Sequence, residues 1–238
     1  VLALFLAAAP LTRRVSDLLL GYHHDVVELG LPPLRARART TAGYLALFLG
    51  LFTAFMLATL WLGPEDSRQF FAFAFESAGV GYESIGDRSF GEMGGLLGHN
   101  LTVLLSFVVL AFLYRNYGTL LALGWTASVW AVSLTEMVRR GHELGEGGPL
   151  LGVLAGVALL PHLVLDALGY VLGALAGTFL SFGMSDRGPR PAPVGPVVKK
   201  TLLLAAAGGV VLTLAALAES RYAPAVLAAA VSGAAAGS

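Results

Sequence analysis

The sequence predicts an all-α integral membrane protein, a bundle of about five transmembrane helices with further amphipathic helices at the membrane surface. Of its 238 residues, 56% are hydrophobic and only 13% are charged, whereas a soluble domain carries about a quarter charged residues. The mean hydropathy is +0.76. A chain of this length has too few polar residues to cover its surface in water, so lipid is the expected solvent.

Charge, cysteine content and motifs exclude several function classes. The formal net charge is zero, so no overall field indicates a nucleic-acid partner. The sequence has no cysteine, which excludes disulfides, thiolate nucleophiles and cysteine-ligated metals. It also lacks a P-loop, a GxSxG motif and a dinucleotide-binding fingerprint. We therefore assign no catalytic residue, no metal site and no cofactor, and we expect a protein that is not an enzyme.

Residues 1–40 are predicted to form an N-terminal region at the membrane surface. The apolar run Val1–Leu11 is too short to span a bilayer, and its arginines follow it, whereas those of a secretory signal come first. An interfacial or packed helix is the prediction, and a truncated spanning helix is the alternative. The segment Arg13–Thr40 mixes charged and apolar residues at helical spacing, which is typical of an amphipathic surface helix.

Five mostly apolar stretches are long enough to cross a membrane. They are Thr41–Gly63, Leu96–Tyr114, Thr119–Val138, His162–Phe182 and Thr201–Ala218. They define a transmembrane domain over residues 41–224, where Pro224 is expected to end the last helical segment, and residues 225–238 form a tail of small residues. Pro161 divides a longer apolar segment, so Leu150–Leu160 is predicted to be a half-helix or a re-entrant arm.

The connecting segments indicate how the spans are oriented. After the first span, the aromatic run Phe70–Phe75 predicts a helix in the interface, within an acidic loop that extends from Glu65 to Glu92. A tight turn is expected at Arg115–Gly118. Lysine and arginine near span ends mark the cytoplasmic side, which places the acidic loop outside and the protein in the cytoplasmic membrane as a multi-pass protein. Arg139 and Arg140 then fall outside, against the rule.

Polar residues within spans are functional candidates, because they are costly in lipid. His162 and Asp166 stand four residues apart, so they share one helix face directly after Pro161. Their pairing suits ion or proton handling or an intramembrane active site. It equally suits a polar pair that fixes a broken helix against its neighbours.

Three further polar residues complete the candidate intramembrane site. His99 and Asn100 open the second span, where Asn100 is expected to clamp two helices or cap one, with a ligand site as the alternative. Glu219 follows the fifth span and suits a structural ion pair or a cap. Apart from these residues, a glycine stripe at positions 169, 173 and 177 predicts close helix packing, either within one bundle or between two copies of the chain.

The motifs around these residues resemble the stage II sporulation protein M family. Three features carry the likeness: a polar pair opening a span before a glycine-containing turn, a Leu-Pro-His motif with an acid four residues after the histidine, and a final span ending in small residues and a glutamate. In this sequence the first feature is His99–Asn100 followed by Gly118–Leu123. The second is Leu160–Asp166 followed by Gly169, and the third is Ala215–Glu219 followed by Pro224. The likeness runs from about Thr41 to Pro224.

The sequence departs from the family pattern at several positions. Leu163 replaces the motif glycine, Asp166 replaces its glutamate and His99 replaces the first asparagine, while Gly124–Trp125 stands where the family has Asn-Gly. The resemblance implies a polytopic membrane protein. The sporulation member looks like a scaffold for cell-wall hydrolases, and relatives without that wall show that this role need not transfer.

Three hypotheses follow for the function. The first is a non-enzymatic scaffold that organises membrane or extracytoplasmic protein partners. The second is a transporter or permease-like subunit that uses Pro161, His162 and Asp166, since discontinuous helices often form transport sites. The third is an intramembrane metal-dependent hydrolase that adds His99 as a ligand, although the spacing supplies no clear third ligand.

Overall fold

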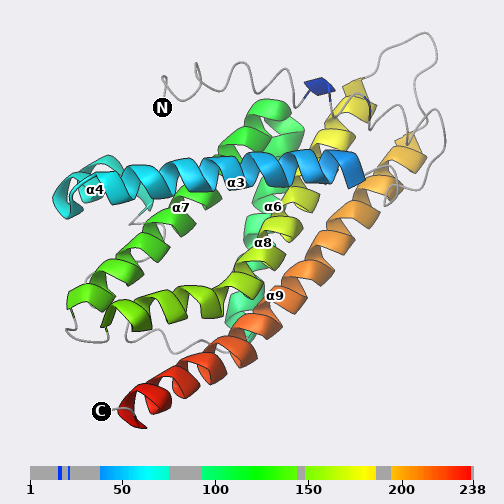
Figure 1. Cartoon of the computed structure of the whole chain (residues 1–238). Helices are drawn as coiled ribbons and strands as arrows, with labels where there is room; N and C mark the ends of the chain where they lie inside the picture. The colour runs from blue at the N-terminus through cyan, green and yellow to red at the C-terminus, as the bar shows by residue number, and fades with distance from the viewer. Residues whose placement is uncertain are drawn as a thin grey trace. The chain divides into compact units, whose positions relative to one another are not determined.

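The computed structural model describes residues 16–17, 21, 38–74, 93–143, 148–185 and 194–236. The longer helices within these ranges are α3 (Ala38–Trp61), α4 (Pro64–Phe70), α6 (Met93–Tyr114), α7 (Asn116–Glu143), α8 (Gly148–Ser185) and α9 (Val194–Ala236) (Figure 1). The predicted helix at Val1–Leu11, nearly all of the amphipathic segment and most of the acidic loop lie outside the described residues.

Five of these helices are long and apolar enough to cross a membrane. The segments are Thr40–Trp61, Leu97–Tyr114, Asn116–Glu136, Leu160–Ser185 and Val194–Arg221. They match the five predicted spans and confirm the all-α, multi-pass fold class. On α6, Leu101, Leu105, Val109 and Leu113 are all exposed at a spacing of four residues. This apolar outer face suits contact with lipid.

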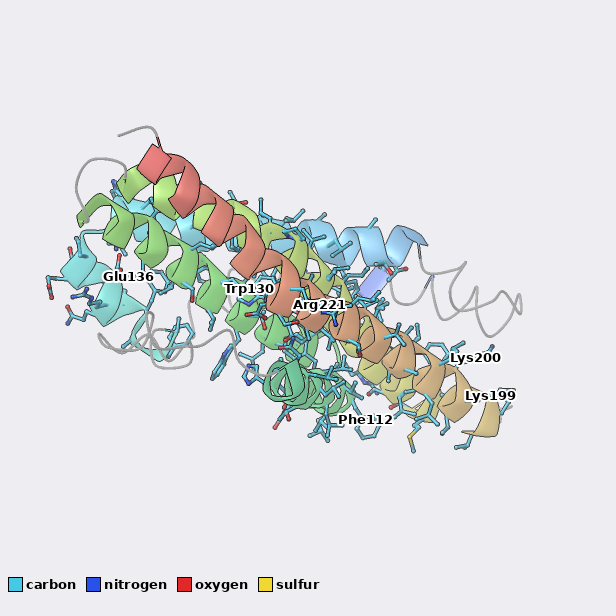
Figure 2. The ribbon with its side chains drawn as sticks, turned by 90° about the horizontal axis from the view of Figure 1, so that it is seen from below. Phe112, Trp130, Glu136, Lys199, Lys200 and Arg221 are labelled. Carbon is cyan, nitrogen blue, oxygen red and sulfur yellow. The ribbon has the colours of Figure 1, made fainter. Side chains whose placement is uncertain are left out.

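Two prolines lie inside helices that they were expected to interrupt. Pro161 lies inside α8, so the predicted half-helix and the fourth span belong to a single helix. Helix α9 continues past Pro224 to Ala236, so the prediction that Pro224 ends the segment is wrong (Figure 1). A proline removes one backbone hydrogen bond, but helices in lipid tolerate this where neighbouring groups satisfy the freed carbonyl. Lys199 and Lys200 also lie within α9, near its N-terminal end (Figure 2).

The turn between α6 and α7 is shorter than predicted. Helix α6 ends at Tyr114 and α7 begins at Asn116, so only Arg115 lies between the helices. Arg115 has a φ of 51°, in the left-handed region that few residues other than glycine adopt. Its guanidinium carbon lies 5.2 Å from the ring centroid of Phe182, a cation–π distance that helps to hold this conformation.

The chain divides into two compact units. Unit 1 comprises Val1–Phe48, Asn100–Gly124 and Ala167–Val211, and unit 2 comprises Leu49–His99, Trp125–Asp166 and Leu212–Ser238. Each of the five long helices therefore contributes one part to each unit.

In unit 1, α8 packs closely against α6 and α9 through small residues. A Cβ atom on Gly177 would lie 2.2 Å from the carbonyl oxygen of Val108, and one on Gly173 would lie 2.5 Å from Leu104. Two members of the predicted glycine stripe thus serve packing within one chain. The neighbouring core cluster is formed by Ala176, Phe179, Val197 and Leu204, all buried.

In unit 2, polar contacts fasten α4 and α7 to the end of α3. The guanidinium of Arg139 donates hydrogen bonds to the carbonyl oxygens of Thr59 (2.5 Å) and Leu62 (2.8 Å). Arg68 donates to Glu136 over 3.3 Å, and Glu136 is only 5% exposed. Arg139 is therefore bound to the end of a helix and is not a free loop charge.

Candidate functional site

Three ionisable side chains of unit 2 meet within two candidate spans. Helix α8 places His162 and Asp166 one turn apart, with His162 Nε2 3.5 Å from Asp166 Oδ2. Helix α9 supplies Glu219, whose Oε2 lies 3.4 Å from the same nitrogen. The side chains of His162, Asp166 and Glu219 are 12%, 4% and 17% exposed. They form a cluster that is mostly enclosed but retains some access.

The charges of this cluster do not balance. One imidazole faces two carboxyl groups, and an imidazolium neutralises only one of two carboxylates. If both carboxyls are ionised, the cluster keeps a net negative charge, which is costly in an apolar surrounding. The arrangement therefore favours uptake of a further proton. One imidazole N–H cannot donate fully to both acids, so Asp166 and Glu219 compete for the proton on Nε2.

The second ring nitrogen of His162 is also notable. Nδ1 is buried and has no hydrogen-bond partner among the described residues. In the neutral imidazole one nitrogen donates and the other accepts, so Nδ1 is available to accept a proton when Nε2 carries one. The histidine can therefore take up a second proton in addition to the one on Nε2.

Asn100 belongs to a different contact from the cluster. Its side chain is 5% exposed in unit 1, and its Oδ1 accepts a hydrogen bond of 3.2 Å from the hydroxyl of Tyr170. This contact joins α6 to α8, as the clamp interpretation of Asn100 requires. The neighbouring His99 is exposed and belongs to unit 2.

Of the five predicted site residues, the structure thus brings together His162, Asp166 and Glu219. The spacing of the first two already predicts their contact, whereas Glu219 was expected only to cap a helix or form an ion pair. Within the described ranges, no group of three or more histidine, aspartate or glutamate side chains is arranged to hold a metal ion.

Comparisons with protein-family models, with curated proteins and with solved structures found no match for the chain. The function proposed below is therefore argued from the residues of this chain, together with the resemblance of its motifs.

Proposed function

We propose that the chain is a proton-coupled transport subunit of the cytoplasmic membrane, with His162, Asp166 and Glu219 as its proton-binding site. The observation that carries this proposal is the convergence of two carboxyl groups, one from α8 and one from α9, on one imidazole nitrogen. Ionisable groups within membrane spans are rare and commonly mark ion pathways.

A purely structural role explains the cluster less well. One histidine and one carboxyl group would be enough to fix two helices by a buried ion pair. The second carboxyl group adds a desolvation cost that such a structural role does not require. Pro161, one residue before His162, removes a backbone hydrogen bond at the site, and such weakened helices recur at transport sites.

Proton flux through reconstituted protein tests this proposal. Proteoliposomes containing a pH-sensitive dye are given a membrane potential, and proton entry is recorded for the wild-type protein and for His162→Gln, Asp166→Asn and Glu219→Gln. We expect flux in the wild type and its loss in each variant, because each change removes a titrating group while keeping a similar size.

The matched control for this experiment is Glu136→Gln, which neutralises a buried glutamate that pairs with Arg68 elsewhere in unit 2. Flux should survive that change. Gel filtration and melting temperature establish that every variant is folded. Absence of wild-type flux, or flux that persists in folded His162→Gln and Asp166→Asn, would contradict the proposal and favour a structural cluster.

A scaffold is the second candidate, and the aromatic residues near α4 favour it. Phe70 and Phe73 are 69% and 45% exposed, while Phe71 between them packs edge-on against Phe55, with ring centroids 5.9 Å apart. Phe73 itself packs edge-on against Trp125, with ring centroids 6.0 Å apart, so Phe70 is the more exposed ring of the group. Exposed aromatic rings are frequent anchors in protein interfaces, and the family resemblance points to the same role.

Cross-linking in native membranes tests the scaffold. The protein is purified in detergent after mild cross-linking, and co-purifying chains are identified by mass spectrometry. If the aromatic residues bind a partner, Phe70→Ala removes it, whereas Leu113→Ala, which trims an equally exposed apolar side chain on α6, does not. Recovery of the chain alone, or only with copies of itself, would count against a scaffold.

A further inference from the structure

The charged residues in the described part of unit 1 are mostly basic. The basic residues are Arg39, Arg115, Lys199 and Lys200, and the acidic residue is Asp17. Arg115 and Lys199 are exposed, and Lys199 and Lys200 lie near the N-terminal end of α9 (Figure 2). An excess of exposed positive charge attracts an anionic partner, and the surroundings of these cations indicate which partner fits.

Contacts within unit 1 place Arg115 and the start of α9 at the same end of the unit. The guanidinium carbon of Arg115 lies 5.2 Å from the ring centroid of Phe182, near the C-terminal end of α8. A Cβ atom on the next residue, Gly183, would lie 2.5 Å from the side chain of Val197 on α9, and Lys199 follows Val197 by two residues. The turn between α6 and α7 and the start of α9 therefore border the same end of α8.

Arginine is an unfavourable residue for the backbone conformation at position 115. The φ of 51° lies in the left-handed region, which is sterically costly for a residue with a Cβ atom. Glycine would avoid this cost, so we expect the side chain of Arg115 to contribute something that glycine cannot. A guanidinium is planar and carries five N–H donors in a geometry that matches phosphate oxygens. The exposed side chain of Arg115 is therefore suited to bind a phosphate group.

Exposed apolar side chains border both cationic positions. On α6, Leu113 and Tyr114 are exposed directly before Arg115. On α9, the exposed Leu203 follows Lys199 by four residues and shares its helix face. Four residues of helix rise about 6 Å, which is similar to the thickness of the headgroup layer, about 5–7 Å on each side of the hydrocarbon core. A cation one turn beyond a leucine that contacts acyl chains therefore lies at the level of the lipid phosphates.

We propose that Arg115, Lys199 and Lys200, which we term the basic end of unit 1, bind the headgroups of anionic phospholipids. The phosphate of such a lipid meets the cations while its acyl chains lie along the exposed apolar side chains below them, whereas a soluble anion would use the cations alone. A zwitterionic headgroup carries its own cation beside the phosphate, so lipids with a net negative charge should be preferred. This surface is separate from the proton-binding cluster of unit 2 and does not depend on the transport proposal.

Native mass spectrometry of the full chain in detergent tests this proposal. The protein is titrated with phosphatidylglycerol and, separately, with phosphatidylcholine of the same acyl chains, and the dissociation constant of the first bound lipid is measured. One basic side chain near an anionic surface strengthens binding about fivefold. We therefore expect phosphatidylglycerol to bind more tightly than phosphatidylcholine by about tenfold or more. Equal dissociation constants for the two lipids would overturn the proposal.

Charge-removing variants locate the lipid on the chain. The double variant Lys199→Gln, Lys200→Gln should weaken phosphatidylglycerol binding about 25-fold and Arg115→Gln about fivefold, with phosphatidylcholine binding unchanged. The matched control is Arg221→Gln, which removes an exposed charge of the same sign from the part of α9 that belongs to unit 2 and should keep the wild-type affinity. Melting temperatures establish that the variants are folded. Wild-type affinity in the folded variants of the basic end, or an equal loss in Arg221→Gln, would overturn the proposal.

Glycerol phosphate distinguishes a lipid from a soluble anion at the basic end. It carries a phosphate group but no acyl chains, so at constant ionic strength it should not displace phosphatidylglycerol from the wild-type protein. Displacement would identify a surface for soluble phosphates and would overturn the assignment to lipid.

Discussion

Gly118→Ala is expected to lower the free energy of unfolding by about 3 kcal/mol, near the upper end of the cost of overpacking a tight core. A Cβ atom at this position would lie 2.0 Å from the carbonyl oxygen of Leu110 and 2.5 Å from its carbonyl carbon. Both atoms belong to the backbone of α6, so no side-chain rotation can relieve the clash. The two helices would have to separate directly after the one-residue turn that joins them.

Gly124→Ala is the matched control for this prediction. Gly124 lies in the same helix and the same unit, but nothing lies within 4 Å of the Cβ atom that alanine would add. Alanine is favoured over glycine in a helix interior by about 1 kcal/mol, so this variant should be as stable as the wild type or more stable. Melting temperatures in detergent provide the comparison. Equal losses in both variants would show that the close approach of α6 and α7 is not what stabilises this region.

The number and place of the spans could be predicted because they depend on local composition. A stretch long and apolar enough to cross lipid is visible in a window of about 20 residues. The first span was predicted at Thr41–Gly63, and the structure has Thr40–Trp61. The ends of the helices were harder to predict. Proline ends a helix chiefly where water can bind the freed backbone groups, whereas an apolar environment favours continuation of the helix.

The candidate site could be predicted only where its contacts follow from helix spacing. His162 and Asp166 are four residues apart, so one helix brings them together. Glu219 reaches them from another helix, and no local pattern fixes the register between α8 and α9. His99 and Asn100 illustrate the converse, since adjacent residues on a helix point about 100° apart. One is exposed and the other is buried against Tyr170.

The burial of Tyr44 was not predicted, and the reason is similar. Tyrosine is common near the ends of membrane spans, but Tyr44 has no exposed surface. Its burial follows from the packing of helices that are distant in the sequence. The local signal was that Tyr44 and the buried Phe48 share one face of α3.

Arg139→Ala is expected to lower the free energy of unfolding by about 2 kcal/mol, the usual range for hydrogen bonds to a charged group. The guanidinium satisfies carbonyl oxygens of Thr59 and Leu62 at the end of α3, where backbone carbonyls lack donors within the helix. Its positive charge also suits the negative end of the helix dipole. Alanine would remove both effects. The carbonyl of Thr59 would keep the hydrogen bond from the hydroxyl of Ser67, over 3.1 Å.

Two further variants make this prediction specific. Lys199→Ala removes an exposed charge of the same sign near the start of α9, and its melting temperature should match the wild type because solvated surface charges contribute little. Arg139→Lys should recover part of the stability, since an ammonium keeps the charge but cannot reproduce the planar fork that reaches two carbonyls. If Arg139→Ala has the same melting temperature as the wild type, Arg139 does not stabilise the end of α3 and is an ordinary loop charge. Its predicted place outside the membrane would then count against the predicted orientation of the spans, because loop arginines mark the cytoplasmic side.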